Sequence, residues 1–487
     1  MTDTTQTVRT PAWASPLGTT LIVVLLMLPR LAFALKFGLI GDEAYYAIWS
    51  FRPAFNYFDH SPSVAWIIWL GRMLFGESAF SVRSLFLLAD LITSAALYRM
   101  ATLLFGRREI GAVAAIAYAV TVGVVITFSV ATPDGPSTMF WVLTLWAVAE
   151  FTRARNANWW LLAGLFAGLG LLSKYTVVFL GAGLLFYLVT SRERLGWLKL
   201  WQVWVGGLVA LLLFSPVVWI NSQRDWNSFR YQLGRSNLSD HALQLGEFSR
   251  FIVEISIQLL PTLFVFTLIG IVAFFARRAK GLALPVLTSL PMAAYFLADA
   301  LFGRVNPNWV APLFPVLAFI GAWAAVTIRP RSRWLRAPLD VLYVLHVPLG
   351  LTLMLLAYTS IDTRSIPFMG KVQAFDFVYG WDDLWSKVSA TAKANGARWV
   401  DTSSYSLNGW LGYYAAIAHD PLPVYETAEP FRYEYLPPMS AELKAAPHLW
   451  VNPGSGGSSS GNMTYLGTIT RDYAGEPLAS YQVFLVK

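Results

Sequence analysis

Two neighbouring stretches decide how the rest of the chain is interpreted: Gly41–Tyr46 (GDEAYY) and Asn56–Pro62 (NYFDHSP). An apolar run ends just before the first stretch, and the adjacent carboxylates Asp42 and Glu43 follow it directly. Membrane edges are usually anchored by tryptophan, tyrosine and basic side chains, whereas carboxylates near lipid are costly and tend to serve a function. The acid pair therefore predicts a catalytic loop at the edge of a membrane-embedded domain.

Composition independently favours a membrane protein. Of the 487 residues, 56% are hydrophobic and 13% are charged, whereas soluble domains contain about 25% charged residues. The 21 tryptophans suit aromatic belts at the two membrane interfaces. The alternative, a large soluble enzyme, is disfavoured by these values. Cysteine is absent, which excludes thiol catalysis, thiolate metal sites and disulfides.

A membrane-spanning helix needs about 20 apolar residues, and eleven segments of the chain approach or meet that length. The first contains Pro29 and Arg30, and Arg30 is expected to reach the interface or to face other helices. A cleaved signal peptide is the alternative for this segment, but no small-residue cleavage site precedes the acid pair. We predict a polytopic α-helical membrane protein whose spans are residues 17–40, 79–105, 110–131, 136–152, 158–173, 175–190, 201–220, 249–276, 281–302, 308–328 and 336–358.

Basic residues mark alternate connections between these spans. All five basic connections fall on the side of the N-terminus, and the positive-inside rule makes that side cytoplasmic. The loops 41–78 and 221–248, and everything after residue 360, then lie on the opposite face, where the catalytic chemistry is expected. The basic connections hold Arg107–Arg108, Arg153 with Arg155, Arg192 to Lys199, Arg277 to Lys280, and Arg329 to Arg336.

The chain changes character after about residue 360. From Ser360 onward there are nine basic and twelve acidic residues, so this part has a net charge of −3. Because the whole chain has a net charge of +8, residues 1–359 carry +11. The basic surplus is therefore a topology signal and predicts no nucleic-acid partner. Helix-like segments (382–395 and 407–417) alternate with strand-like ones (398–403, 423–427, 448–452, 465–470 and 481–486). They predict a small α/β domain, residues 360–487, with a mainly parallel sheet. Because no phosphate-cradling glycine motif opens its first helix, a nucleotide-binding role has weak support.

Two polar residues in other loops of the outer face are candidates for the same site. Asp134 lies in Ala131–Pro136 (ATPDGP), which is either an ordinary hairpin or the source of a second acid beside Asp42. Lys174 follows the glycine-spaced helix Gly164–Gly170, a spacing that permits close helix packing. The lysine is either a headgroup anchor or a ligand for a substrate phosphate.

Two further outer loops carry basic residues against the positive-inside bias, and such residues need an anionic partner. A lipid phosphate is the natural candidate. The loops are Trp219–Arg235 and Arg304–Trp309, and their candidate residues are Asn221, Arg224, Arg235, Arg304 and Asn308.

Histidines give little support for a metal site. His60 is beside the acid pair in the outer stretch, whereas His346 lies in an apolar span and is expected to be structural. No HExxH or His-x-His pairing is present. We therefore predict no cofactor: a divalent metal is possible but has no support in the sequence.

In this order the motifs resemble those of the GT-C superfamily of integral-membrane glycosyltransferases. The resemblance covers most of the membrane part. It is closest to the branch that contains protein O-mannosyltransferases, the lipid A aminoarabinose transferase and rhizobial lipopolysaccharide galacturonosyltransferases. The motifs that carry it are Asp42-Glu43 after the first span, Tyr57–Pro62 (the family's Tyr-Phe-Glu-Lys-Pro-Pro loop), the acidic turn Thr132–Asp134, the helix end Gly168–Lys174, Asn308–Pro312, and the tail segment Tyr405–Tyr414.

This resemblance implies an inverting glycosyltransferase. The donor would be a sugar linked to polyprenyl phosphate, and the acceptor lipid A, lipopolysaccharide core, another glycolipid or a protein. The site would lie on the periplasmic face of a bacterial inner membrane. The aminoarabinose transferases have arginine where Tyr45 stands and lysine where His60 stands. This departure puts aminoarabinose transfer in doubt and leaves neutral hexose, pentose or uronic acid donors open. The cation for the lipid phosphate must then come from Lys174, Arg224, Arg235 or Arg304.

The chemistry implied by the resemblance needs a single base. A polyprenyl phosphate is already a stabilised leaving group, whereas glycoside hydrolysis needs two carboxyls. Asp42 is the predicted base; Glu43 either supports it or contacts substrate, and Asp134 is the next candidate. The other substrate-contacting residues expected in the opening stretches are Tyr45, Tyr46, Tyr57, Asp59 and His60.

The main alternative is a transporter or flippase of lipid-linked sugars. It would share many spans, arginines for an anionic substrate and aromatic grooves. It should also place polar groups near the bilayer midplane and show paired repeats. No convincing internal repeat is present, and the polar clusters lie at span ends on one side.

Overall fold

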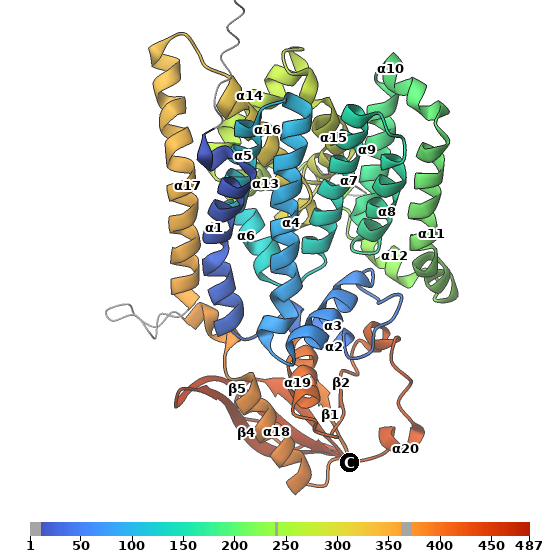
Figure 1. Ribbon diagram of the computed structural model, residues 1–487. Helices are drawn as coiled ribbons and strands as arrows, with labels where there is room; N and C mark the ends of the chain where they lie inside the picture. The colour runs from blue at the N-terminus through green and yellow to red at the C-terminus, as the bar shows by residue number, and fades with distance from the viewer. Residues whose placement is uncertain (1–10, 239–241, 362–372) are drawn as a thin grey trace, which may run out of the picture.

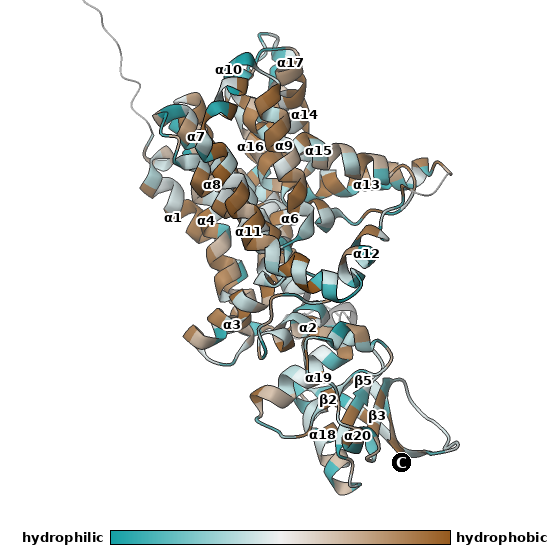
Figure 2. Ribbon diagram, turned by 90° about the vertical axis from the view of Figure 1, so that its right-hand side faces the viewer, coloured by the Kyte–Doolittle hydropathy of each residue, from teal (hydrophilic) through white to brown (hydrophobic). Residues whose placement is uncertain are grey.

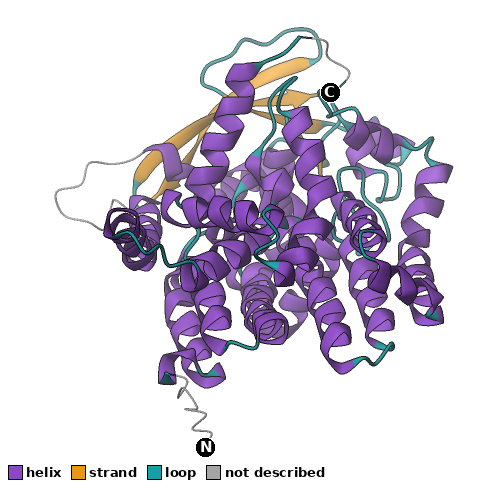
Figure 3. Ribbon diagram, turned by 90° about the horizontal axis from the view of Figure 1, so that it is seen from above, coloured by secondary structure: helices purple, strands orange, loops and turns teal. Residues whose placement is uncertain are grey.

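A computed structural model describes residues 11–238, 242–361 and 373–487. Most of the molecule is a bundle of helices, and a small sheet lies beyond one end of it (Figure 1). Figure 3 shows the strands gathered in one region apart from the bundle. The bundle helices are α1 (Pro16–Lys36), α4 (Ala79–Phe105), α5 (Arg108–Ala119), α6 (Val122–Ser129), α7 (Asp134–Ala154), α8 (Trp159–Leu171), α9 (Val178–Val189), α11 (Trp201–Gln223), α13 (Leu245–Leu259), α14 (Pro261–Phe275), α15 (Ala283–Asp299), α16 (Leu313–Thr327) and α17 (Arg333–Ile361).

Each predicted span coincides with helix, and the apolar residues are concentrated on bundle helices such as α8, α9 and α11 (Figure 2). Within the described ranges, five helices are long and apolar enough to cross a membrane alone, and up to eight candidates result if each bent pair counts as one. The chain is therefore a multi-pass membrane protein. The number of about eleven crossings stays a prediction.

Two predicted spans are broken rather than straight. The segment 249–276 was expected to be one helix, but α13 and α14 meet at 107°, and α5 and α6 meet at 66°. The sharper break follows from Pro261, which lacks an N–H and disfavours helical geometry in the residue before it. That residue, Leu260, has a φ of 64°. As a result α13 runs across the other helices (Figure 2).

Close packing of α8 on α11 is confirmed at the glycines of α8. A Cβ on Gly164 would lie 2.0 Å from the carbonyl oxygen of Gly206, so only glycine permits this approach. The end of α8 is therefore fixed against α11, and Lys174 follows directly after that end.

Two polar side chains inside the bundle, Arg30 and His346, have specific partners. Arg30 faces the interior, where it forms an ion pair with Asp90 and donates to the Ala119 carbonyl oxygen. His346 is hydrogen-bonded to Thr262 at 2.8 Å and to the carbonyl oxygen of Ala117 at 3.1 Å, which agrees with a structural role. Buried charges need such partners because desolvation is expensive.

The outer loops contain short helices that the hydropathy pattern does not indicate. Loop 41–78 forms α2 (Gly41–Trp49) and α3 (Ser63–Phe75), and loop 221–248 contains α12 (Asn227–Leu233). Residues 239–241 of the second loop lie outside the described residues. The helix α2 starts at the acid pair, so both carboxylates belong to its first turn.

The tail forms the predicted helices and strands, but its sheet is mixed. β1 (Trp399–Thr402) pairs in parallel with β2 (Val424–Tyr425) and β3 (His448–Pro453), whereas β5 (Glu476–Val486) pairs antiparallel with β3 and with β4 (Met463–Tyr473). The strand order is β2-β1-β3-β5-β4, so the expectation of a mainly parallel sheet is wrong for its β5-β4 half. The tail helices are α18 (Trp381–Ala394) and α19 (Tyr405–Ile417).

The antiparallel half follows from the turn between β4 and β5. Ala474 and Gly475 have φ of 52° and 79°, and two consecutive residues with positive φ form the tight turn typical of hairpins. The predicted domain boundary at residue 360 stays a prediction: α17 runs to Ile361, and residues 362–372 lie outside the described residues.

The tail contacts the bundle through α19, which packs on α2. A Cβ on Gly409 would lie 2.6 Å from the backbone nitrogen of Tyr45, and Trp410 Nε1 donates to the Leu39 carbonyl oxygen at 2.8 Å. The opposite end of the bundle carries α10 (Arg192–Leu195; Figure 1). There a cavity of about 200 Å³ brings several basic connections together, with Arg155, Arg194 and Lys280 among its lining residues.

Candidate active site

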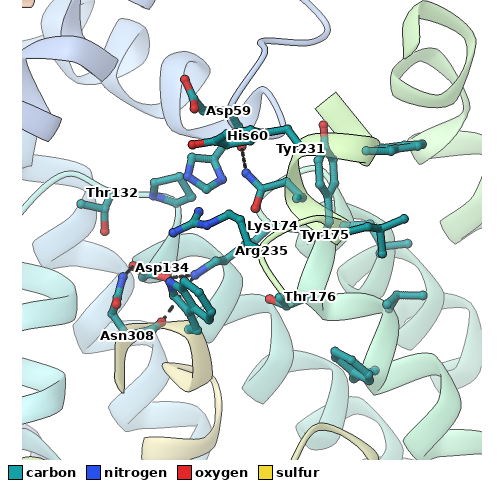
Figure 4. A pocket seen from close by; sticks show the side chains of 18 of the residues that line it. Asp59, His60, Thr132, Asp134, Lys174, Tyr175, Thr176, Tyr231, Arg235 and Asn308 are labelled. Atoms are coloured by element: carbon teal, nitrogen blue, oxygen red, sulfur yellow. Dashed lines mark hydrogen bonds and ion pairs between the residues drawn. The ribbon is translucent and has the colours of Figure 1, made fainter. Parts of the chain in front are cut away.

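A cavity of about 740 Å³ lies where the acid-pair helix, the ends of several bundle helices and the tail meet. Figure 4 shows its polar part, with side chains from distant segments pointing into a common space. The sequence-predicted residues that line it are Asp42, Tyr45, Tyr46, Asp59, His60, Asp134, Lys174, Arg235 and Asn308.

Asp42 is the carboxylate that opens α2, and its side chain is exposed towards the cavity. Tyr405 of α19 donates a hydrogen bond from its hydroxyl to Asp42 Oδ1 at 3.2 Å. No lysine or arginine in the described part of the chain forms an ion pair with it. Desolvation by the surrounding protein raises the pKa of Asp42; the Tyr405 hydrogen bond opposes this, and the carboxylates Asp134, Asp59 and Glu43 add to it.

Glu43 lies away from the cavity and is fully buried. It forms an ion pair with Arg83 of α4, with Nε to Oε1 at 2.7 Å, and accepts the backbone N–H of Ala131 at 2.8 Å. Glu43 therefore ties α2 to α4 and to the turn that carries Asp134. This placement agrees with support of its neighbour rather than with direct contact to substrate.

Asp134, Lys174 and Asn308 converge from three segments. Asp134 is the first residue of α7, Lys174 follows α8, and Asn308 lies in η5 (Pro307–Val310). Lys174 Nζ is 2.5 Å from Asp134 Oδ1, and Asn308 Nδ2 donates to Asp134 Oδ2 at 3.3 Å (Figure 4). The lysine charge is therefore partly neutralised before any ligand is present.

Arg235 differs from Lys174 because its positive charge lies against aromatic rings rather than against a carboxylate. Its guanidinium lies 4.6 Å from the centre of the Trp309 ring and 6.0 Å from that of Tyr231. Among the described residues it has no carboxylate partner. Figure 4 shows its side chain extending into the cavity beside that of Lys174. Arg235 is thus available to an anion.

Arg432, from the tail, reaches the same cavity but is paired. It forms an ion pair with Asp59, and its Nε donates to Glu429 Oε2 at 2.7 Å. Asp59 also accepts the Tyr45 hydroxyl at 2.7 Å and, through its carbonyl oxygen, the side chain of Gln232 at 2.5 Å. Asp59 is therefore the point where α2, α12 and the tail are joined.

His60 lies against the Tyr46 ring, with ring centroids 5.8 Å apart. Desolvation lowers its pKa well below the usual value, and the cations Lys174, Arg235 and Arg432 act in the same direction. At neutral pH this imidazole is uncharged. It therefore does not replace the positive charge of the lysine that the aminoarabinose transferases have at this position.

The remaining wall of the cavity is apolar. It is formed by α9, α11 and α15, and several of its side chains are also exposed on the outside of the bundle, with Val178 60% and Leu211 65% exposed. A cavity with one polar end and one apolar wall fits an amphiphilic ligand. The wall residues are Val178, Phe179, Leu211, Phe214, Val218 and Phe296.

Four predicted residues lie outside the cavity. Tyr57 is buried, stacks on Trp49 with ring centroids 4.1 Å apart, and accepts the backbone N–H of Ala54. Asn221 is buried near the end of α11, and Arg224 donates to the Glu434 carbonyl oxygen of the tail at 3.0 Å. Arg304 is exposed and does not line the cavity. The structure therefore does not place these four predicted residues at the cavity.

Several lining residues were missed by sequence reasoning, among them Asp299, Tyr405 and Arg432. Asp299 ends α15 and accepts Ser236 Oγ at 3.0 Å and the backbone N–H of Asn237 at 2.7 Å. An acid inside the predicted span 281–302 was the signal that could have found it. Tyr405 begins the tail motif, which gave no reason to place it beside Asp42. No local signal marks Arg432.

Across the ranges that the structure describes, no group of three or more histidine, cysteine, aspartate or glutamate side chains is arranged to hold a metal ion.

Comparison with known proteins shows what the chain is similar to. The family model of dolichyl-phosphate-mannose-protein mannosyltransferases matches residues 59–220. Lipid A galacturonosyltransferase RgtD of Rhizobium johnstonii is 23% identical over 323 residues, which cover 63% of this chain and 65% of that protein. The structure of ArnT from Cupriavidus metallidurans bound to undecaprenyl phosphate superposes with a TM-score of 0.62, at 14% identity, over 95% of this chain and 97% of ArnT. The chain is therefore similar to proteins of the ArnT-like branch of the GT-C superfamily.

Two further proteins are similar to this chain. The archaeal oligosaccharyltransferase AglB from Archaeoglobus fulgidus, in complex with an inhibitory peptide and a dolichol-phosphate, gives a TM-score of 0.52 at 13% identity, over 89% of this chain and 69% of AglB. An uncharacterized protein of Aquifex aeolicus is 25% identical over 54% of this chain. The match spans 65% of RgtD and 52% of the Aquifex protein.

The resemblance predicted from the motifs is therefore confirmed, and so is a GT-C fold with a small sheet domain in the tail. The matched range 59–220 includes His60, Asp134 and Lys174 but excludes Asp42, Arg235 and the tail. The part that these excluded residues play in this chain rests on its own geometry.

Proposed function

We propose that this chain is an inverting glycosyltransferase that moves a sugar from a polyprenyl-phosphate-linked donor to an envelope acceptor. The acceptor class is lipid A or lipopolysaccharide core, another glycolipid or a protein. One observation carries the proposal: among the described residues, the same cavity holds a carboxylate without a cation, Asp42, and a guanidinium without a carboxylate, Arg235. A base and an anion ligand are what this transfer needs.

In the proposed reaction, Asp42 takes the proton of the acceptor hydroxyl. The acceptor oxygen forms a bond with the anomeric carbon, and the bond from that carbon to the phosphate oxygen breaks. Attack from the face opposite the phosphate inverts the anomeric centre. Polyprenyl phosphate leaves as a stabilised anion, so a second carboxyl acting as an acid is not needed, in contrast to glycoside hydrolysis. A positioned general base contributes about 10²–10⁴-fold to the rate.

Arg235 and Lys174 are the proposed phosphate ligands. Arginine suits phosphate because its planar fork can form two parallel hydrogen bonds, and fixed cations stabilise the charge that develops on the leaving group. Arg235 is expected to contribute more to phosphate binding than Lys174, because Lys174 already forms an ion pair with Asp134. ArnT is bound to undecaprenyl phosphate and AglB is in complex with a dolichol-phosphate, and both support a polyprenyl phosphate as the lipid.

The apolar wall between α9 and α11 is the proposed path of the prenyl chain. Its exposed residues Val178 and Leu211 would meet lipid in a membrane, so the chain could extend from the phosphate directly into the bilayer. Burying apolar surface contributes roughly 25 cal/mol per Å², and a long prenyl chain has ample apolar surface.

We further propose that the protein lies in a bacterial inner membrane with its N-terminus in the cytoplasm and its cavity and tail in the periplasm. The support is the basic connections at the bundle end opposite the tail. Alkaline phosphatase fused after Lys487 should be active, and a fusion in the connection Arg277–Lys280 should be inactive. A stably expressed but inactive fusion at Lys487 would contradict this orientation.

The proposed activity is tested with purified protein in liposomes. The donors are undecaprenyl-phosphate hexose, pentose and uronic acid, and the acceptors are glycolipids and lipopolysaccharide extracted from a deletion strain. Sugar transfer is followed by mass spectrometry. Wild-type protein should transfer one donor class, and Asp42→Asn should lower turnover at least about 100-fold, as the loss of a general base implies.

Asp42→Asn preserves size, so donor binding and the melting temperature should stay near wild type. If a folded Asp42→Asn protein transfers sugar at a near-normal rate, Asp42 is not the base, and Asp134 becomes the next candidate. If wild-type protein transfers none of the donors, the proposed activity fails.

A further inference from the structure

A closed ring of contacts links the tail to α2 at the candidate base. Tyr405 donates to Asp42 Oδ1 at 3.2 Å, and the Arg432 guanidinium lies 4.9 Å from the centre of the Tyr405 ring. Arg432 forms an ion pair with Asp59, which accepts the hydroxyl of Tyr45 at 2.7 Å. Tyr45 is three residues after Asp42 on α2, and its ring centroid is 5.0 Å from that of Tyr405.

The tail delivers both residues from one edge of its sheet. β1 ends at Thr402, and Ser404 caps the helix α19 by accepting the Leu407 N–H, so Tyr405 is the first helical residue. β2 ends at Tyr425 and is followed by the short segment that holds Arg432. These are the carboxyl ends of two parallel strands, the edge at which α/β sheets place their ligand sites. In this chain that edge faces the cavity of the bundle.

The tail is held in this position by direct packing. α19 approaches α2 so closely at Gly409 that a side chain there would collide with the Tyr45 backbone, and Trp410 donates to the Leu39 carbonyl oxygen just before α2. Arg224 at the end of α11 adds a contact to Glu434 of the tail. The position of Tyr405 relative to Asp42 is therefore set by several independent contacts.

We propose that the tail completes the reaction site: Tyr405 is a positioning residue that hydrogen-bonds the base Asp42, and Arg432 holds both Tyr405 and Asp59 in place. This inference rests on the proposed function, since it concerns the same base. According to this inference, the tail contributes to the chemical step by orienting the base. One oxygen of Asp42 is fixed by Tyr405, which leaves the other free for the acceptor hydroxyl.

The hydrogen bond also affects when Asp42 is ionised. The carboxylates Asp134, Asp59 and Glu43 raise the pKa of Asp42, as desolvation does, and the hydroxyls of Tyr405 and Tyr46 are also close to it. Tyr405 favours the carboxylate and lowers the pKa. Loss of this bond raises the pKa of Asp42. Since the base works only when ionised, the acid limb of the turnover profile then moves to higher pH.

The test uses Tyr405→Phe, which removes the hydroxyl and keeps the ring between Tyr45 and Arg432. Turnover at neutral pH should fall about 2- to 10-fold, the equivalent of one hydrogen bond. The loss should grow at acid pH and shrink at alkaline pH. Tyr413→Phe is the matched control on the same helix, because the Tyr413 hydroxyl is buried and has no hydrogen-bond partner within the described ranges. Its profile should match wild type.

Arg432 is tested by comparing Arg432→Met with Arg432→Lys. Arg432→Met should lower kcat more than it raises the donor KM, and Arg432→Lys should restore part of kcat because it keeps the charge opposite Asp59. A purely structural role predicts instead that melting temperature falls with kcat per folded molecule unchanged, and that result would overturn the role of Arg432.

The possible failures can be told apart. Active wild-type protein whose Asp42→Asn variant is inactive, but whose Tyr405→Phe profile equals that of wild type, overturns this inference and leaves the proposed function standing. Wild-type protein without transferase activity contradicts both.

Discussion

Charged side chains in this molecule occupy two contrasting regions. Inside the helical bundle and beneath the cavity they are matched, as Arg30 is with Asp90 and Arg83 with Glu43. In the cavity, Asp42, Asp299 and Arg235 have no ion-pair partner among the described residues, but Asp299 is held by Ser236 and by the Asn237 backbone. Matched charges hold helices together, and unmatched charges remain available to a ligand. The distinction separates structural from candidate reactive groups without reference to any relative.

The contrast is sharpest between the neighbours Asp42 and Glu43. Successive residues of an α-helix point about 100° apart, so one carboxylate of the pair faces the cavity while the next faces Arg83 and the Ala131 backbone. Two residues of the same charge and nearly the same chemistry thus have different surroundings because of helical phase alone.

The largest expected effect comes from breaking the buried pair. Glu43→Gln leaves the Arg83 guanidinium buried and uncompensated, and breaking such a pair typically costs about 3–5 kcal/mol of stability. The free energy of unfolding, measured by denaturation in detergent, should fall accordingly.

The matched control for this change is Glu77→Gln. Its partner Arg72 is 2.6 Å away, but the Glu77 side chain is 39% exposed, and such a pair contributes at most about 1 kcal/mol. If Glu43→Gln unfolds at the same denaturant concentration as the control, the proposed structural role of Glu43 is wrong.

Local patterns in the sequence predict the helices and strands well, because hydropathy and turn residues act over short distances. The acid pair, the turn at Asp134 and the helix end at Lys174 were each recognised locally, and the structure brings Asp42, Asp134 and Lys174 to one cavity. Their functional roles stay predictions. The bend at Leu260 shows the limit even locally, since an unbroken apolar run conceals the break that Pro261 imposes.

What could not be predicted depends on helical phase and on docking between distant segments. Loop 41–78 was not expected to form α2, so nothing indicated which acid would face the cavity. Tyr405 lies 363 residues from Asp42 and Arg432 lies 373 residues from Asp59. Such contacts follow from the packing of α19 on α2 and have no signature in either segment alone.

The second expected effect concerns the two outer-loop arginines that sequence reasoning treated alike. Arg235→Ala should weaken donor binding by about 1.5–3 kcal/mol, the range for a hydrogen bond to a charged group. Arg304→Ala is the matched control and should bind donor as wild type does, because Arg304 is exposed and outside the cavity. The measurement is equilibrium binding of an undecaprenyl-phosphate sugar.

Arg235→Lys sharpens this comparison. It keeps the charge but loses the planar fork, so its donor affinity should fall between those of wild type and Arg235→Ala. If Arg235→Ala and Arg304→Ala lose the same amount of donor affinity, the cavity does not bind the phosphate.

The smallest expected effect is at His60, which stands where the resembling aminoarabinose transferases carry lysine. Burial and the nearby cations keep its pKa well below the usual value. A lowered pKa means that the ring gains a proton only at acid pH, so at neutral pH it offers no positive charge to a phosphate. His60→Gln should therefore change the free energy of donor binding by no more than about 0.5 kcal/mol. The effect is small because an uncharged His60 makes no ionic contact with the phosphate. Donor affinity measured from pH 6 to 8 should also follow the same curve in wild type and His60→Gln. A wild-type affinity that rises on acidification in this range, with the rise absent from His60→Gln, would show a charged His60 in the phosphate site and would place a third cation beside Arg235 and Lys174.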